Sequence, residues 1–228
     1  MENIAENLLK TRARIVAAEQ KYGRPAGSVS LLAVSKTHAA DTIRIAVAAG
    51  QHHFGENYLQ EALEKIGVLP QADLIWHFIG PVQTNKTRQL AENFHWVHCV
   101  DRFKVAKRLS ESRPAHLAPL NICIQVNISG ESTKSGVATE QVAELARQIL
   151  PLPGLSLRGL MVIPAPQTDF ELQRVAFRQT RLLMQELNAT GMQLDTLSMG
   201  MSDDLETAIA EGATMVRIGT AIFGSRQT

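Results

Sequence analysis

The chain alternates between short apolar runs and longer amphipathic stretches, and this alternation restricts its fold more than any other feature. The eight apolar runs are of strand length and lie at residues 30–34, 52–54, 74–79, 96–100, 121–128, 157–163, 195–199 and 214–218. The amphipathic stretches between them, which we expect to be helices, lie at residues 41–49, 56–66, 84–93, 102–112, 139–150, 169–189 and 203–211. Apolar runs separated by helices predict βαβ units and a parallel sheet.

A further helix is expected before the first run, where Ile4, Leu8 and Ile15 recur near the helical period. Eight strands, each preceded by a helix, favour a closed (β/α)8 TIM barrel over an open doubly wound sheet. An open sheet usually carries a glycine-rich loop after its first strand, whereas "SKTHAAD" at residues 35–41 contains no glycine. No linker interrupts the pattern, so we predict one α/β domain over residues 1–228.

The charge balance and the cysteines restrict the partners and the compartment. The 23 basic and 22 acidic side chains leave a net charge of only +1, which does not favour nucleic acid or an anionic membrane as a partner. Cys99 and Cys123 lie in apolar segments without metal-ligand spacing, as buried thiols of a reducing compartment do. The polar N-terminus does not resemble a signal peptide, and no apolar run approaches the ~20 residues that span a bilayer. We therefore predict a cytoplasmic protein.

In such a barrel, functional residues lie where the strands end. The expected strand ends are rich in polar residues and glycine, including Ser35-Lys36-Thr37, Gly55-Glu56-Asn57, Gly200-Met201-Ser202 and Gly219-Thr220. These types are scarce within the runs, so the ends predict the rim of a site.

Lys36 has the same strand parity as Leu32 and Val34, so its side chain is expected to point with theirs into the barrel. Burial there disfavours the charged amine, and a neutral lysine amine forms Schiff bases with carbonyl compounds. The alternative is a lysine that extends past the strand end into water.

The last two strand ends favour a phosphate site, because TIM barrels often bind phosphate with the loops after strands seven and eight. Gly200 and Ser202 follow the seventh run, and Gly219 and Thr220 follow the eighth. Helix capping by Ser202 and a simple turn at Gly219 are the alternatives.

Arg217 shares the parity of Met215 and Gly219 and is expected to point into the barrel. An inward arginine must be paired or must contact a ligand, because it keeps its charge. The two possibilities are an ion pair with an acid such as Asp101 and a contact with a ring nitrogen. A lysine amine, a phosphate site and an inward arginine together describe a site for pyridoxal 5′-phosphate.

The motifs "LLAVSKT", "FGENYLQE", "WHFIGPVQTNK", "QVNISGESTKSG", "RGLMVI" and "LSMGMSDDLETAIAEGATMVRIGTAIFG" resemble the pyridoxal phosphate homeostasis protein family, from about residue 30 to residue 224. The resemblance implies a fold-type III barrel like the N-terminal domain of alanine racemase. It also implies a set of cofactor-binding residues. In this set Lys36 is the Schiff-base lysine, Arg217 faces the pyridine nitrogen and Asn57 lies beside the ring. The phosphate is held by Ser202, Gly219 and Thr220, and Met201 belongs to the set as the neighbour of Ser202 in the same loop.

The sequence departs from the common family pattern at His38, where "KTHA" replaces "KTKP". Lys134 matches a family lysine, although a solvated loop lysine is the preferred interpretation. His77, His95 and His98 are expected to be packed polar rings, and no cluster has the spacing of a metal site.

Racemisation needs acid–base groups on both faces of the substrate, and the chain contains only two tyrosines, Tyr22 and Tyr58, for the second group that alanine racemase takes from another domain. Arginine at the ring nitrogen also leaves the ring a weak electron sink. We therefore predict a monomeric, non-catalytic protein that holds the cofactor on Lys36, maintains intracellular vitamin B6 and supplies apo-enzymes, with indirect effects on amino-acid and keto-acid balance. The alternatives are a small fold-type III racemase or lyase, and a Schiff-base aldolase without the cofactor.

Overall fold

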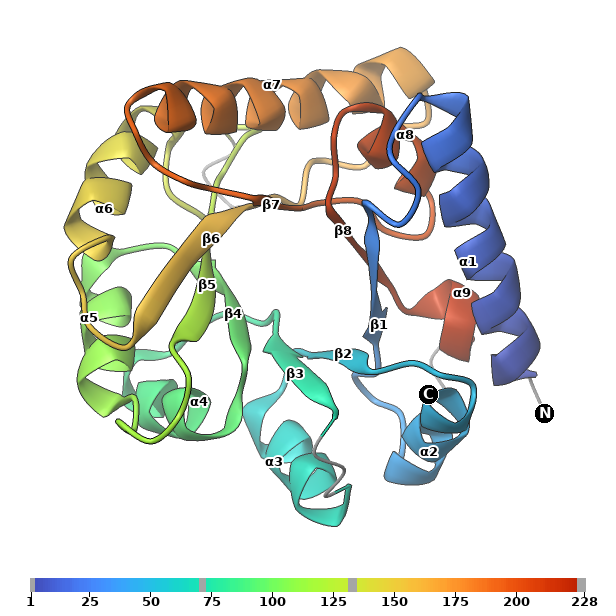
Figure 1. The fold of residues 1–228 in the computed structure, drawn as a ribbon, viewed down its shortest axis with the longest axis horizontal. Helices are drawn as coiled ribbons and strands as arrows, with labels where there is room; N and C mark the ends of the chain where they lie inside the picture. Colours follow the sequence, from blue (N-terminus) through green and yellow to red (C-terminus); the bar gives the residue numbers. More distant parts are fainter. Residues whose placement is uncertain (1–2, 70–72, 131–134, 225–228) are drawn as a thin grey trace.

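A computed structural model of the chain describes residues 3–69, 73–130 and 135–224. Eight parallel strands close into a barrel in chain order (Figure 1). They are β1 Ser30–Val34, β2 His53–Glu56, β3 Ile75–Phe78, β4 Trp96–Val100, β5 Leu120–Gln125, β6 Leu155–Met161, β7 Thr196–Ser198 and β8 Met215–Ile218. The predicted (β/α)8 barrel is confirmed.

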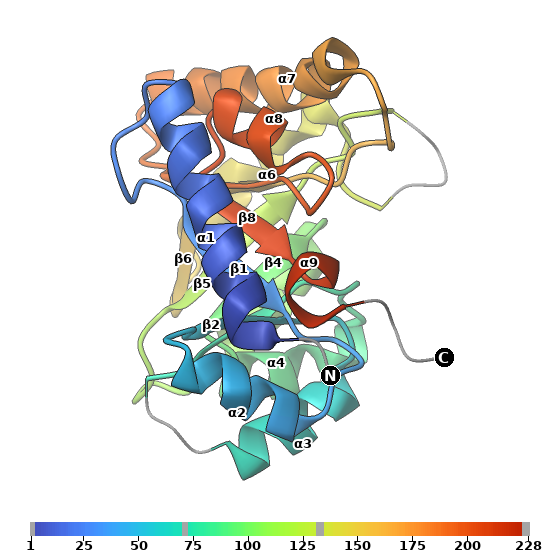
Figure 2. The ribbon, with the colours of Figure 1, turned by 90° about the vertical axis from the view of Figure 1, so that its right-hand side faces the viewer.

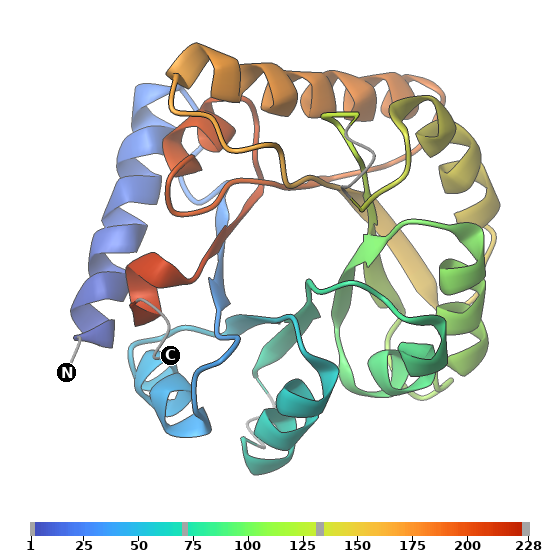
Figure 3. The same cartoon turned by 180° about the vertical axis from the view of Figure 1, so that it is seen from behind.

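The helices form a ring outside the strands, as the opposite view in Figure 3 also shows. They are α1 Ile4–Lys21, α2 Ala40–Ala48, α3 Leu59–Val68, α4 Thr87–Asn93, α5 Phe103–Ser112, α6 Val142–Ile149, α7 Phe170–Ala189, α8 Leu205–Ala210 and α9 Thr220–Phe223, with short 3-10 turns at Thr84–Lys86 and Thr139–Gln141. Side chains on the outer face of the sheet, such as Phe54, and on the helices, such as Phe177, are fully buried between the two layers. Each such burial contributes roughly 2 kcal/mol.

Most element bounds differ from the prediction by one to three residues, and two differences lie next to the strand ends that form the site. The second strand extends to Glu56 because Gly55 and Glu56 pair with His77 and Phe78 of β3, so α3 begins three residues later than expected. The four-residue helix α9 was not predicted, since four residues show no helical period.

Helix α1 lies along β1 and β8, next to α8 and α9 (Figure 2). Asn7 donates from Nδ2 to the Ile222 carbonyl oxygen at 3.1 Å, and Arg14 donates from Nη2 to the Ser202 carbonyl oxygen at 3.1 Å. The first helix therefore holds the segments that follow the last two strands. None of the helices among the described residues is long and apolar enough to cross a membrane.

Candidate functional site

A pocket of about 270 Å³ opens where the strands of the barrel end. Its walls come from the ends of β1 and β8 and from the segments after β2, β3, β6 and β7. All seven residues of the predicted cofactor set line it, namely Lys36, Asn57, Met201, Ser202, Arg217, Gly219 and Thr220. The structure thus brings together side chains that are up to 184 positions apart in the sequence, from position 36 to position 220.

The turn that carries Lys36 is held on both sides. Lys65 of α3 donates from Nζ to the Ser35 carbonyl oxygen at 2.8 Å, and the Thr37 amide donates to Glu61 Oε1 at 2.6 Å. Thr37 has a φ of +67°, an unusual conformation for a β-branched residue that is found where surrounding contacts enforce it. Lys36 is itself half-buried at the pocket wall.

Behind this turn lies a buried ionic cluster that sequence reasoning missed. Lys65, only 5% exposed, contacts Glu56 Oε1 at 2.7 Å and Glu61 Oε1 at 2.6 Å. The Ser35 hydroxyl donates to the same Glu56 oxygen at 2.6 Å. Burial raises the pKa of Glu56, and the Lys65 ammonium and the Ser35 hydroxyl oppose that rise. The only sequence signal was the four-residue spacing of Glu61 and Lys65 on one helix face.

Arg217 is buried and points into the barrel, as predicted. Its Nη1 donates to the carbonyl oxygen of Ser198 at 2.5 Å and to the Ser198 hydroxyl oxygen at 2.9 Å, and its Nη2 donates to the Val162 carbonyl oxygen at 2.9 Å. Burial lowers the pKa of Arg217, yet a guanidinium keeps its charge in proteins. The ion pair with Asp101 is not formed, because Asp101 pairs with the adjacent Arg102 at 2.6 Å.

The loop after β7 is fixed by its own residues and by α1. Gly200 has a φ of +95°, and a Cβ there would lie 2.6 Å from that of Ala208, so this position requires glycine. The Met201 amide donates to Asp204 Oδ1 at 2.5 Å, and burial raises the pKa of Asp204. Ser202 is not the cap of α8, because that helix begins at Leu205; it lies in the loop and lines the pocket.

The loop after β8 approaches β1 closely. A Cβ on Gly219 would lie 3.1 Å from the Val34 carbonyl oxygen, so a side chain there would force the two segments apart. Thr220 follows as the first residue of α9. Gly219 therefore lies where the end of β8 meets the end of β1. Both strand ends contribute to the wall of the pocket.

The histidines inside the barrel are packed, as expected, but they also contact one another. His77 and His98 are fully buried. The Nδ1 of His53 lies 3.0 Å from Nε2 of His77, and the Nδ1 of His77 lies 2.9 Å from Nε2 of His98. The prediction of a packed ring was wrong for His95, which is exposed and separate from them. Its Nδ1 accepts a hydrogen bond from the Trp76 amide at 3.0 Å. The described residues contain no metal-binding cluster.

Other candidates lie away from the pocket. Tyr22 and Tyr58 are not among its described lining residues. Cys99 and Cys123 are buried free thiols, as predicted, and burial raises the pKa of Cys99 to about 12. Lys134 lies outside the described residues.

Comparisons with known proteins agree with this geometry. Residues 6–227 match the family described as "Alanine racemase, N-terminal domain". The pyridoxal phosphate homeostasis protein of Pseudomonas aeruginosa is 59% identical to the chain, over 99% of this chain and 97% of its own length. The protein of the same name from Escherichia coli is 50% identical, over 99% of this chain and 98% of its own length. PipY of Synechococcus elongatus, solved with PLP bound, is 38% identical with a TM-score of 0.84, over 97% of this chain and all of that one. Alanine racemase from Clostridium difficile shares the fold alone, at 12% identity and a TM-score of 0.78 over 99% of this chain and 57% of that one.

Proposed function

Because the chain belongs to the pyridoxal phosphate homeostasis protein family, whose barrel is that of the alanine racemase N-terminal domain, we propose that it binds pyridoxal 5′-phosphate (PLP) at the barrel mouth and acts as a carrier of this cofactor. The observation that carries the proposal is the pocket itself, which joins a strand-end lysine, a buried arginine and the two loops predicted to hold phosphate. PipY, the relative with PLP bound in its structure, supports the same assignment.

The residues of the pocket fit the chemical groups of PLP. Arg217 has five N–H donors, of which three bind Ser198 and Val162. The other two have no partner among the described residues and suit the ring nitrogen, an acceptor. The Oδ1 of Asn57 is buried without a hydrogen-bond partner in the described part of the chain, so it suits a donor on the ligand. Ser202 and Thr220 supply hydroxyls for the phosphate.

Lys36 would hold the cofactor covalently. Its amine would be the nucleophile for a Schiff base with the aldehyde of the cofactor, with loss of one water molecule. The turn around Lys36 is fixed by Lys65 and Glu61, which keeps the amine at the pocket wall. PLP, when bound, supplies an electron sink for amino-acid chemistry.

Arg217 limits that chemistry. A carboxylate at the ring nitrogen would keep the nitrogen protonated, whereas a guanidinium can only donate and cannot accept the proton. The site is therefore better suited to retaining PLP than to stabilising a carbanion. Among the described lining residues, no tyrosine is present to serve as a second acid–base group. We therefore propose a non-catalytic protein that buffers PLP and passes it to apo-enzymes; its cytoplasmic location and monomeric state stay predictions.

Reduction with borohydride tests the covalent site. Purified protein incubated with PLP is reduced and digested, and the labelled peptide is identified by mass. We expect the label on Lys36, its loss in Lys36→Ala, and its retention in Lys86→Ala, a lysine outside the pocket lining. Label on another lysine would overturn the assignment of Lys36.

Turnover tests the carrier role. Loaded protein is incubated with each amino acid, and optical rotation and keto-acid release are followed. We expect no turnover above that of free PLP, and we expect activity to appear when an apo-enzyme is added. Turnover that disappears in Lys36→Ala would show that the protein is a racemase or lyase.

A further inference from the structure

A row of polar side chains crosses the interior of the barrel and ends on Arg217. It begins at His53 on β2 and passes through His77 on β3, His98 on β4 and Ser198 on β7. The last step joins Nδ1 of His98 to the Ser198 hydroxyl oxygen at 2.9 Å. That oxygen also accepts from Nη1 of Arg217 at 2.9 Å. We call this row the histidine chain.

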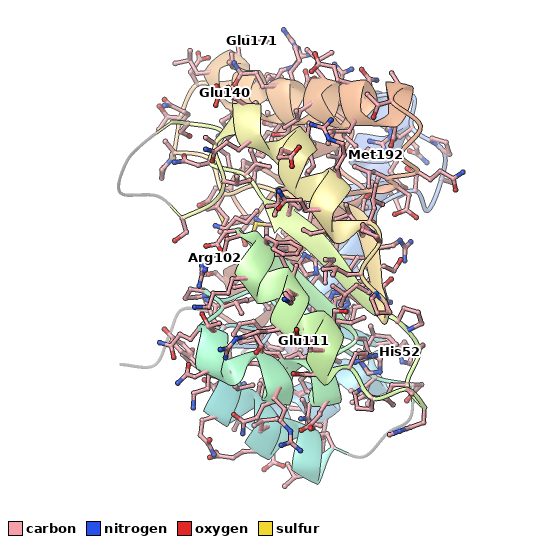
Figure 4. The ribbon with its side chains drawn as sticks, turned by 90° about the vertical axis from the view of Figure 1, so that its left-hand side faces the viewer. His52, Arg102, Glu111, Glu140, Glu171 and Met192 are labelled. Carbon is pink, nitrogen blue, oxygen red and sulfur yellow. The ribbon has the colours of Figure 1, made fainter. Side chains whose placement is uncertain are left out.

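The histidine chain starts near the end of the barrel opposite the pocket. His53 is the first residue of β2, and His52 directly precedes it. In Figure 4, His52 lies on the opposite side of the molecule from Arg102, which follows the end of β4. The histidine chain therefore connects the amino ends of the strands with a residue of the pocket.

Arg217 imposes a direction on this chain. The guanidinium can only donate, so the Ser198 oxygen must accept from it. Among the described residues, the one acceptor available to the hydroxyl hydrogen of Ser198 is Nδ1 of His98. In a fully buried position an unused hydroxyl donor is costly, so Ser198 donates to His98 Nδ1.

The same logic continues through the two buried rings. Burial lowers the pKa of His98 to about 3 and that of His77 well below its usual range, so both rings are neutral and each has one donor and one acceptor nitrogen. With its Nδ1 accepting, His98 carries its proton on Nε2 and donates to His77 Nδ1. His77 then carries its proton on Nε2 and donates to His53 Nδ1. The His77 ring is further held by stacking on Trp96, with centroids 5.4 Å apart and an angle of 12°.

We propose that the histidine chain is a set of positioning residues for Arg217, with every ring in the Nε2–H form and every hydrogen bond donated away from Ser198 toward His53. The histidine chain holds the guanidinium of Arg217 so that the two remaining N–H donors of Arg217 face the pocket. This role rests on the proposed PLP function. Its members touch neither the pocket nor its ligand and act through Arg217.

Nitrogen NMR of the ligand-free protein, with labelled histidine, tests the direction of the chain without any cofactor. We expect neutral Nε2–H forms for both His77 and His98. A proton on Nδ1 of either ring, or a charged ring, would overturn the proposal.

Ser198→Ala tests the link to Arg217. It removes the hydroxyl but leaves the two backbone carbonyl acceptors of the guanidinium. We expect PLP affinity to fall by about tenfold or more, as for loss of a hydrogen bond to a charged group. The tautomers of His98 and of the more distant His77 should both change, a signature that a purely structural loss would not produce. His98→Phe, which keeps the shape of a ring without its nitrogens, is expected to weaken PLP binding similarly.

The matched control is Thr196→Val, which removes a buried hydroxyl two residues earlier on β7. That hydroxyl contacts Asp195 and not the histidine chain, so the tautomers and the PLP affinity are expected to persist. Restoring a hydroxyl with Ser198→Thr should recover both. If PLP binds and Ser198→Ala changes neither affinity nor tautomers, the inference fails while the proposed function stands. If PLP does not bind the unaltered protein, the proposed function fails and the positioning role falls with it.

Discussion

Acid should destabilise this protein through the two fully buried histidines. Unfolded His98 takes up a proton as pH falls through its ordinary pKa of 6.5, whereas the folded ring, buried and near Arg217, does not do so until about pH 3. Between pH 6.5 and about 3 the unfolded state therefore binds more protons than the folded state. The contribution of His98 to the free energy of unfolding is present above pH 6.5 and is lost as the pH falls toward 3. His77 acts in the same direction, because burial also lowers its pKa.

The size of the effect follows from the two pKa values of His98. At pH 4.5 the pH is about two units below the pKa of the unfolded ring, whereas the folded ring is still neutral. The loss of stability relative to neutral pH is therefore about 3 kcal/mol, at roughly 1.4 kcal/mol per pH unit. Urea unfolding at each pH measures it. In His98→Gln the side chain no longer titrates, so the difference between the two pH values should shrink by about this amount, whatever the variant's absolute stability.

The matched control is His116→Gln, which alters an exposed ring outside the histidine chain and is expected to keep the acid-side loss of the unaltered protein. An unchanged pH difference in His98→Gln would refute the reasoning, since the buried ring would then not be the group that the unfolded state protonates.

Three further predictions concern the support of the pocket. Lys65→Met should destabilise the fold by about 3–5 kcal/mol in urea unfolding, because it leaves Glu56 buried and unpaired. Adding Glu56→Gln should recover much of this loss. A double variant as unstable as Lys65→Met would contradict a charge effect. Arg14→Ala should weaken PLP binding in a fluorescence titration, since Arg14 holds the Ser202 loop, whereas Arg12→Ala, on the same helix but bonded to Ala49 and Gly50, should not. Thr220→Ala should release PLP more readily on dialysis while the circular dichroism spectrum persists, and unchanged retention would remove Thr220 from the phosphate site.

Strand parity was sufficient to orient Arg217, because side chains alternate strictly along a strand. Lys36 lies two residues beyond the end of β1, and it lines the pocket because parallel strands end at one face of the barrel. The same rule located the loops after β7 and β8. It did not predict the cluster of Glu56, Glu61 and Lys65, because the rotation of a helix against the sheet depends on packing that no local pattern states. The contacts between His53, His77 and His98 were also missed: the residues are 24 and 21 positions apart, and only the barrel's closure and register bring their rings together.

The two cationic residues of the pocket are supported in opposite ways, and the difference follows from what each must do. The turn of Lys36 is held from outside the barrel by charged side chains of α3, which fix the backbone. Arg217 is held from inside by neutral oxygens and, through Ser198, by neutral rings. No salt bridge to it is formed among the described residues, and Asp204 attracts it only at longer range. Burial of such a cation costs stability, and an anionic ligand in the same pocket would recover that cost. A buried charge without a salt bridge is thus placed where the acceptor nitrogen of the ring and a phosphate would meet it.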